Sequence, residues 1–206
     1  MIGEHPELFP DLIYVSPYLR TRLTANYLLK DIKGLDINFD HLTDEEQLQD
    51  LILGSFNGRD ITIKIEERIR ERDHGGNIAP NYVRDYLEGK KNATHLLSKT
   101  QKNKLHYYTA PEGGESQVEV NARTREFLSK IYQKEEYKNI LIVSHHLTII
   151  SALMSIFGGS FNSFTDIDEN RRPRNGSFTF LSEIPKTEMG RENKFRVSGY
   201  NLSLEE

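Results

Sequence analysis

NILIVSHHLTII, residues 139–150, decides the fold that we predict for this chain. Ile140–Val143 is apolar, rich in β-branched residues and without alternation, as in a parallel strand covered on both faces of its sheet. Apolar residues then recur at helical spacing over 147–157, and two glycines end the predicted helix. Ser144 and His145 therefore lie where a strand meets a helix amino terminus, which is where open α/β sheets bind ligands and where N–H groups favour anions.

Composition excludes several classes of protein. The 206 residues carry a net charge of −4, with 28% charged side chains, so their overall charge does not favour nucleic acid or an acidic membrane as a partner. The absence of cysteine excludes disulfide bonds, zinc–thiolate sites and thiol catalysis. No apolar run reaches the length of a membrane span, and the first residues lack the pattern of a signal peptide. We therefore expect a cytoplasmic protein with no nucleic-acid or membrane partner.

A second junction of strand and helix lies near the amino end. Asp11–Val15 is apolar enough for a buried strand, and Ser16 with Pro17 follows it directly. Serine caps helix amino termini and proline suits the first helical position, so we predict a helix over 17–30. Its apolar face is expected to hold Leu19, Leu23 and Tyr27. Arg20 falls in the first turn, where a guanidinium suits a bound phosphate better than it suits the helix dipole.

Weaker signals predict elements in the middle of the chain. Residues 35–39 read as a short strand, and Thr43 with Glu46 forms a capping-box pattern that would open a helix through Leu53. A loop is expected over 54–58, and the alternation in 61–65 predicts an edge or half-covered strand.

The remaining elements follow from similar patterns. Residues 77–111 are predicted to hold two modest helices that cover the site, and Ser116 with Glu119 forms another capping box that opens a helix ending near Ile131. We expect a polar loop over 161–174. Closing strands are predicted at 177–181 and 195–198.

Four motifs in this chain occur in a familiar order and spacing. They are Ser-Pro-Tyr-Leu-Arg-Thr-Arg-Leu-Thr-Ala at 16–25, Ile-Arg-Glu-Arg-Asp-His-Gly at 69–75, Gly-Gly-Glu-Ser at 113–116 and Val-Ser-His at 143–145. Together they resemble the histidine phosphatase superfamily, the phosphoglycerate mutase-like proteins, over about residues 11–181. The resemblance implies an α/β fold, a three-layer α/β/α sandwich with a mostly parallel sheet, in a single domain over 1–206.

The resemblance also implies a site for phosphoryl transfer. Glu71 would be the acid and base that protonates the leaving oxygen and activates water, and His145 would donate to the phosphoryl oxygens. Glu67 also precedes an arginine, but Glu71 leaves Gly75 at the family spacing. The resemblance places Arg20, Ser144 and His146 at the phosphate, and Arg72 and Ser116 at the rest of the substrate. No cofactor or metal is expected.

One motif of the superfamily is missing. Its nucleophile is a histidine in an Arg-His-Gly motif after the first strand, and these 206 residues contain no Arg-His-Gly. We therefore expect the first strand to be missing too, and the chain to be an N-terminally shortened phosphatase with weak activity or none.

Two functions stay open at this stage. The first is a phosphomonoester hydrolase that acts through a phosphohistidine intermediate on a phosphorylated small molecule or a phosphoprotein. The second is a non-catalytic pseudoenzyme that binds phosphate or phosphoprotein. Glu71 favours the hydrolase, because a pure binding site gains little from a carboxylate beside a phosphate. Three questions stay open: which phosphorylated substrate the protein uses, whether it is a mutase or a phosphatase, and what its oligomeric state is.

A metal site is a third hypothesis. Its ligands would be His145, His146, Glu71, Asp73 and His74. Adjacent histidines point in different directions and rarely bind one ion together, so this hypothesis is the weakest of the three.

Overall fold

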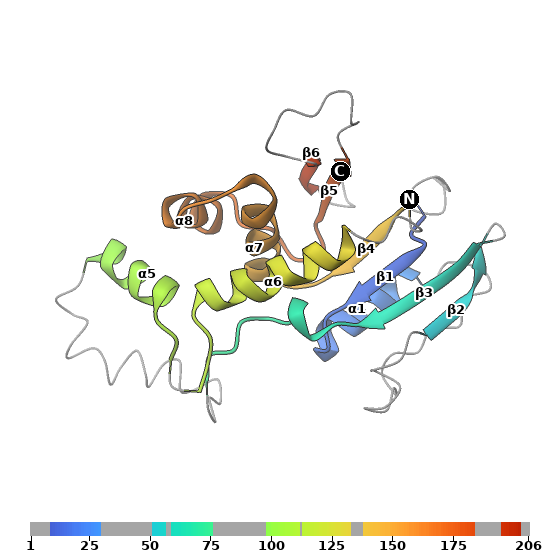
Figure 1. The fold of residues 1–206 in the computed structure, drawn as a ribbon, viewed down its shortest axis with the longest axis horizontal. Coiled ribbons are helices and arrows are strands. Elements are labelled where there is room, and N and C mark those ends of the chain that lie inside the picture. Colours follow the sequence, from blue (N-terminus) through green and yellow to red (C-terminus); the bar gives the residue numbers. More distant parts are fainter. Residues whose placement is uncertain are drawn as a thin grey trace.

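The computed structural model describes residues 9–29, 51–56, 59–75, 98–111, 113–132, 138–183 and 195–202 (Figure 1). Its strands are β1 (Leu12–Val15), β2 (Leu51–Phe56), β3 (Arg59–Ile65), β4 (Ile140–Val143), β5 (Phe178–Glu183) and β6 (Phe195–Leu202). Its helices are α1 (Leu19–Leu29), α5 (Lys99–Tyr108), α6 (Gln117–Ile131), α7 (His146–Phe157) and α8 (Phe161–Asn170), with a short 3₁₀ helix at Glu67–Ile69. The strand predicted over 35–39, the start of the helix predicted from Thr43 and the first part of the 77–111 cover lie outside the described residues. No described helix is long and apolar enough to cross a membrane.

The central sheet has the strand order β2-β3-β1-β4, and β5 pairs only with β6 in a separate antiparallel sheet. β1 runs parallel to both of its neighbours, with Val15 opposite Ile65 of β3 and Val143 of β4. The carboxyl ends of β1, β3 and β4 therefore meet at one end of the sheet. Polar residues that follow these strands are brought together there.

Helices cover both faces of the sheet. On one face, Ile13 and Val15 pack with Ala25 and Leu29 of α1. On the other face, Leu12 and Tyr14 pack with Phe127 of α6, whose ring meets Tyr14 edge-on at 4.9 Å. Alternate residues of β1 therefore belong to two separate hydrophobic cores, because successive side chains of a strand point to opposite faces of the sheet. The predicted α/β sandwich with a mostly parallel sheet is confirmed.

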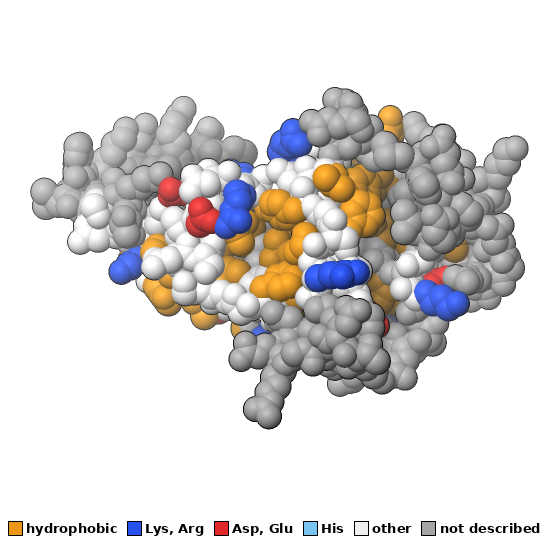
Figure 2. All heavy atoms as spheres, turned by 90° about the horizontal axis from the view of Figure 1, so that it is seen from above, with side chains coloured by type: hydrophobic (Ala, Val, Ile, Leu, Met, Phe, Trp, Pro, Cys, Tyr) orange, Lys and Arg blue, Asp and Glu red, His pale blue; other side chains and the backbone are white. Residues whose placement is uncertain are grey.

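β4 is less covered than its sequence predicts. Val143 is buried, but Ile142 is 37% exposed, and the side chains before it are half-buried. The strand has β1 on one edge, and no strand among the described residues pairs with its other edge. Figure 2, a view onto the side that carries α8, β5 and β6, shows hydrophobic side chains gathered in a hollow with lysine and arginine side chains around it. Side chains of β4 still pack on both faces of the sheet, since Leu141 and Val143 contact the core beneath α1 and Ile140 contacts the core beneath α6, so the prediction of a strand covered on both faces holds except at Ile142.

The predicted helix is confirmed as α1, but the face that holds Leu19, Leu23 and Tyr27 is exposed. Leu19 is 53%, Leu23 is 45% and Tyr27 is 66% exposed. The buried side of the helix holds Thr21, Ala25 and Leu29 instead. The small side chains of Thr21 and Ala25 let α1 lie close to β1. The spacing of the larger apolar residues therefore marks the face of the helix that is exposed to solvent.

Two further segments differ from the sequence predictions. Residues 51–56, predicted as the end of a helix and the start of a loop, form β2, which pairs with β3 in an antiparallel hairpin. β3 is consequently an inner strand of the sheet rather than an edge. The predicted polar loop at 161–174 contains α8, which Ser160 caps and which buries Phe161.

The capping box at the start of α6 is confirmed. Ser116 accepts a hydrogen bond from the backbone N–H of Glu119, while the Glu119 carboxylate accepts from the Ser116 backbone N–H and hydroxyl. The same hydrogen bonds lower the pKa of Glu119. Ser116 is buried, so no water can replace the lost partner if its hydroxyl is removed.

We predict that Ser116→Ala lowers the free energy of unfolding by about 1–2 kcal/mol, measured by urea denaturation. The matched control is Ser98→Ala, which removes the same kind of box from the exposed start of α5 and should cost about 0.5 kcal/mol. Equal losses in both variants would contradict a special role for burial at Ser116.

Candidate active site

Ser16 and His145 meet where β1 and β4 end. The Ser16 backbone N–H donates to the Val143 carbonyl at 3.0 Å, which keeps the two chain segments in register beyond the strands. The Ser16 hydroxyl then lies 2.8 Å from Nε2 of His145. Both side chains are buried. Ser16 was predicted to cap the following helix, but in the structure its hydroxyl is hydrogen-bonded to the His145 imidazole instead.

Arg20 approaches the other nitrogen of the same imidazole. Its Nε and Nη2 lie 3.1 and 2.9 Å from Nδ1 of His145. A guanidinium can only donate, so Nδ1 must be the unprotonated acceptor and Nε2 must carry the hydrogen that Ser16 accepts. Burial, followed by the charge of Arg20, lowers the pKa of His145 from 6.5 to about 3. The imidazole is therefore neutral near pH 7.

Glu71 completes a three-residue cluster. Its Oε2 lies 3.5 Å from Nη2 of Arg20 and 3.7 Å from Nδ1 of His145. The Glu71 side chain is 15% exposed, whereas that of Arg20 is 62% exposed. The carboxylate and imidazole are thus enclosed, and the guanidinium is the component that an incoming anion meets first.

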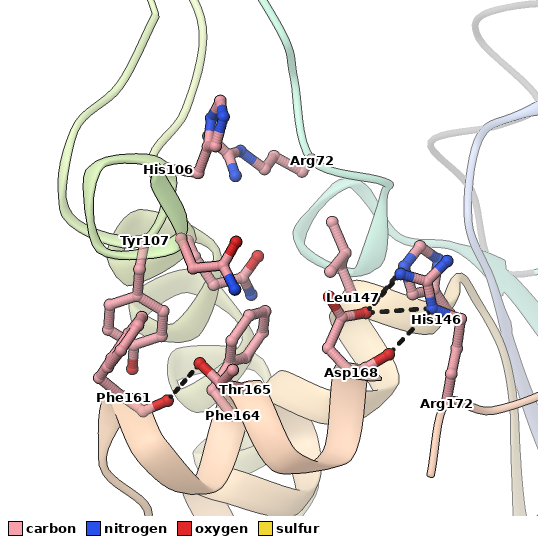
Figure 3. Close-up of a pocket in the computed structure, with 12 residues that line it drawn as sticks. Arg72, His106, Tyr107, His146, Leu147, Phe161, Phe164, Thr165, Asp168 and Arg172 are labelled. Carbon is pink, nitrogen blue, oxygen red and sulfur yellow. Dashed lines mark hydrogen bonds and ion pairs between the residues drawn. The ribbon is translucent and has the colours of Figure 1, made fainter. Parts of the chain in front are cut away.

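His146 extends the cluster toward α8. Its Nδ1 lies 3.9 Å from Oε2 of Glu71, and its Nε2 lies 3.6 Å from Oδ1 of Asp168 (Figure 3). Burial is the largest influence on this imidazole and lowers its pKa, although the two carboxylates oppose the shift. Among the described residues, no group of three or more His, Cys, Asp or Glu side chains is arranged to hold a metal ion.

Side chains of α6, of α7 and of the residue that follows β4 hold the loop that carries Glu71. The carbonyl oxygens of residues 68–71 each accept a side-chain hydrogen bond. Arg123 donates to the carbonyls of Arg68 and Glu71, Ser144 to that of Ile69 and Thr148 to that of Arg70, at 2.7, 3.2, 2.7 and 2.8 Å respectively. The backbone that leads from the 3₁₀ helix to Glu71 is therefore fixed by side chains of other segments.

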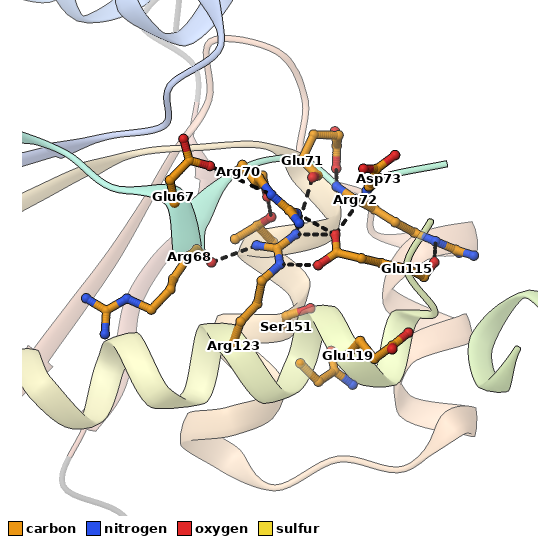
Figure 4. A network of polar contacts seen from close by, with 12 residues as sticks. Glu67, Arg68, Arg70, Glu71, Arg72, Asp73, Glu115, Glu119, Arg123 and Ser151 are labelled. Carbon is orange, nitrogen blue, oxygen red and sulfur yellow. Dashed lines mark hydrogen bonds and ion pairs between the residues drawn. The ribbon is translucent and has the colours of Figure 1, made fainter. Parts of the chain in front are cut away.

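Glu115 links this loop to α6 (Figure 4). Its carboxylate accepts hydrogen bonds from Arg70 at 2.5 Å, from Arg123 at 2.9 and 3.1 Å, and from the backbone N–H of Asp73 at 3.0 Å. Although burial opposes the charge, these donors lower the pKa of Glu115 from 4.5 to about 2. Carboxylate and guanidinium are mutually satisfied, which is the condition under which a buried ion pair supports a structure.

Gly114 allows the two loops to touch. A Cβ atom built on Gly114 would lie 2.5 Å from the backbone nitrogen of Gly75, a distance that no other residue type could tolerate without moving the loop. The Glu115 backbone N–H donates to the Asp73 carbonyl in the same region. The glycine thus permits the approach that brings Glu115 to Arg70.

The structure brings most of the predicted site residues together. Arg20, Glu71, His145 and His146 form one cluster, and Arg72 follows Glu71 with its Nε donating to the Glu115 carbonyl at 2.7 Å. Ser144 was predicted to contact the phosphate, but its hydroxyl donates to the Ile69 carbonyl. Ser116 was predicted to contact the rest of the substrate, but its hydroxyl caps α6.

Sequence reasoning missed three residues that build this site. They are Ser16, Glu115 and Arg123. Glu115 lies inside the quoted Gly-Gly-Glu-Ser motif, which was a usable signal. Nothing local marked Arg123 as part of the site, because the loop carbonyls to which it donates lie more than 50 residues away in the chain.

We predict that Arg123→Ala lowers the free energy of unfolding by about 3 kcal/mol, because it removes one of the two guanidinium partners of Glu115 and the side-chain donor of two loop carbonyls. Arg125→Ala is the matched control, since Arg125 is exposed on the same helix, and it should change stability by less than about 0.5 kcal/mol. Denaturant unfolding measures both. Similar stabilities for the two variants would contradict the role given to Arg123.

The lowered pKa of His145 predicts a pH dependence of stability. Between pH 6.5 and about 3 the unfolded chain binds a proton at this imidazole and the folded chain does not, so stability falls as the pH falls through this range. We expect His145→Gln to reduce the slope of unfolding free energy against pH between pH 5 and 6.5, above the range in which Glu115 titrates. His146 shifts in the same direction and accounts for a remaining slope. The control His74→Gln, at an exposed position, should keep the full slope; an unchanged slope in His145→Gln would refute the assignment.

Several solved structures, two of them described as phosphatases, share this fold. The α-ribazole phosphatase of Shigella flexneri aligns with a TM-score of 0.63 and 16% identity over 96% of this chain and 76% of that chain. A mycobacterial glucosyl-3-phosphoglycerate phosphatase with inorganic phosphate gives 0.61 and 18% over 96% and 80%, and Bacillus stearothermophilus YhfR gives 0.62 and 17% over 97% and 78%. At these identities the similarity shows the fold alone.

The sequence itself identifies the family. No curated protein matches the chain. A family model described as histidine phosphatase superfamily (branch 1) matches residues 52–183, which is more than half of the chain and contains Glu71, the Glu115 loop and both histidines of the cluster. The chain therefore belongs to the histidine phosphatase superfamily, branch 1.

Proposed function

We propose that this chain provides the phosphate-binding and acid–base part of a phosphomonoester hydrolase that works through a phosphohistidine. The observation that carries the proposal is the convergence of Arg20, Glu71 and His145 from three separate segments to within 3.7 Å of one another. A cation, a carboxylate and a neutral imidazole gathered at one point, with the cation exposed, are the groups that phosphoryl transfer to and from an ester oxygen requires.

The free cluster suggests how it would respond to a phosphate. Arg20 now shares its charge between Glu71 and His145, and a phosphate dianion offers its exposed guanidinium a stronger, bidentate partner. Once Arg20 turns to the phosphate, Nδ1 of His145 can take up a proton and donate to a phosphoryl oxygen. Glu71 then faces the ester oxygen; in its protonated form it would give its proton to that oxygen as the P–O bond breaks and the phosphoryl group passes to the nucleophilic histidine. His146 would contact the phosphate beside it, and Arg72 the rest of the substrate.

The nucleophile is the part that these residues do not provide. The superfamily uses a histidine in Arg-His-Gly, and the 206 residues contain no such motif. We propose that the chain as given binds phosphate but forms no phosphohistidine unless a segment with Arg-His-Gly is joined to it. The same absence favours a second candidate function, a pseudoenzyme that binds phosphate or a phosphoprotein without turnover.

The proposal extends to the whole chain. We propose a single domain over 1–206 in which 77–111 covers the site, since α5, at the end of that segment, packs against α6 and α8. The substrate is a phosphorylated small molecule or phosphoprotein, and the location is cytoplasmic. Ser116 and Ser144 act by holding α6 and the Glu71 loop rather than by touching the substrate.

Hydrolysis of p-nitrophenyl phosphate tests the proposal. We compare the 206-residue chain with a form extended upstream through its native reading frame, and we introduce Glu71→Gln and His145→Ala into each. The extended form should turn over, and Glu71→Gln should lower its kcat by about 10²–10⁴-fold. Glu67→Gln is the matched control, because that carboxylate is 70% exposed on the same loop, and it should leave kcat unchanged.

Each alternative gives a different result. Phosphate binding without turnover in every form, including the extended one, would favour the pseudoenzyme. Turnover by the 206-residue chain itself would refute the proposed source of the nucleophile. Equal losses of kcat in Glu71→Gln and Glu67→Gln would refute the role of Glu71.

A further inference from the structure

A pocket of about 220 Å³ opens beside the Glu71 cluster, between α5, α7 and α8 (Figure 3). His146 belongs to both, since it lines the pocket and lies 3.9 Å from Oε2 of Glu71. Arg72, the residue after Glu71, lines it as well. A group attached to an ester oxygen at Glu71 would therefore extend into this pocket.

One wall of the pocket is aromatic. Tyr107 of α5 and Phe161 and Phe164 of α8 line it, with ring centroids 5.3 Å apart for Tyr107 and Phe161 and 5.1 Å apart for Tyr107 and Phe164. Tyr107 and Phe161 are buried, which fixes the wall. The Phe164 ring projects from α8 toward the interior of the pocket, with Leu147 of α7 on the opposite side (Figure 3). These two walls present flat and aliphatic surfaces to whatever lies between them.

The other side of the pocket is polar and carries charges of both signs. Arg72, His146, Asp168 and Arg172 line it, and Arg172 pairs with Asp168 at 2.9 Å. Because the charges on this side are largely paired with one another, they favour polar substituents on a ligand without demanding a further net charge.

The size of the pocket limits the ligand. A cavity of about 150 Å³ holds one benzene molecule, so about 220 Å³ suits a single substituted ring. An aromatic ring also gains contact energy against aromatic side chains beyond the area that it buries. A flexible aliphatic chain lacks this gain.

We propose that this pocket binds the leaving group of the substrate, and that this group carries a single aromatic ring at or next to the ester oxygen. The inference rests on the proposed function, because it takes the phosphate to lie at Arg20, Glu71 and His145. Phe164 is the specificity-determining residue, and His146 separates the ring from the phosphate.

Calorimetric titration of the 206-residue chain with phenyl phosphate and methyl phosphate tests this proposal. The two ligands carry the same charge, so the ratio of their affinities measures the contribution of the pocket. Phenyl phosphate should bind about tenfold more tightly than methyl phosphate. Phe164→Ala should reduce the ratio to about twofold or less and leave the affinity for methyl phosphate unchanged, which also verifies that the variant is folded.

Phe157→Ala is the matched control. Phe157 is 36% exposed at the end of α7 and does not line the pocket, so the same substitution there should keep the tenfold ratio. A second variant, Thr165→Phe, adds a ring to the pocket lining and should abolish the preference for phenyl phosphate by filling the space. Equal binding of the two ligands to the unaltered chain, or an unchanged ratio in Phe164→Ala, would overturn the inference and leave the phosphate site untouched.

Phenol separates a failure of the pocket from a failure of the phosphate site. It lacks the phosphate, and its binding can be followed by saturation-transfer NMR. If neither phosphate ester binds while phenol binds and Phe164→Ala removes that signal, the proposed function fails and the aromatic pocket stands. If phenol gives no signal and neither ester binds, both are overturned.

Discussion

The hydrogen bonds to the carbonyls of residues 68–71 are the constraint on which the site depends. After β3 ends at Ile65, the chain has only one short 3₁₀ helix before it reaches Glu71. Backbone groups that are not paired in a helix or strand need other partners when they are partly buried. Arg123, Ser144 and Thr148 provide them. The carboxylate of Glu71 thus has a fixed position because α6, α7 and the end of β4 hold the backbone that carries it.

A second constraint is electrostatic. His145 is neutral because it is buried and because Arg20 donates to Nδ1. Glu71 lies 3.5 Å from the same guanidinium, so the positive charge of Arg20 faces both the carboxylate and the imidazole. Arg20 is also its most exposed member and comes from α1, so an anion can redirect it without disturbing the carbonyl contacts. The rigid and the adjustable parts of the site therefore lie on different elements.

The sequence predicts the elements whose signals are local. The box of Ser116 and Glu119 and the helix that ends at Gly158 depend on residues a few positions apart, and both are confirmed. β2 was missed because pairing with β3 outweighed a helix-like pattern. The helix at 161–170 was missed although Phe161, Phe164 and Ile167 recur at helical spacing, because polar residues between them resemble a loop.

The site residues that lie in sequence motifs could be predicted, whereas those whose position depends on the packing of helices could not. Arg20, Glu71 and His145 lie in three separate motifs, and the parallel strands β1, β3 and β4 explain why they meet. Arg123 and the hydrogen bond of Ser16 depend on how α6 and α1 lie against these strands. The exposure of Ile142 could not be read from the apolar sequence of β4, since it depends on which side chains of other elements pack over that residue.

Imidazole ¹⁵N NMR of His145, with and without inorganic phosphate, tests most directly the claim that Arg20, Glu71 and His145 form a phosphate site. Without phosphate, Nδ1 should show the shift of an unprotonated nitrogen and Nε2 that of a protonated one at pH 7. Saturating phosphate should protonate Nδ1, because the dianion replaces Arg20 as its partner, and Arg20→Ala should prevent saturation at the same concentration. Unchanged His145 shifts in the presence of phosphate would contradict the claim.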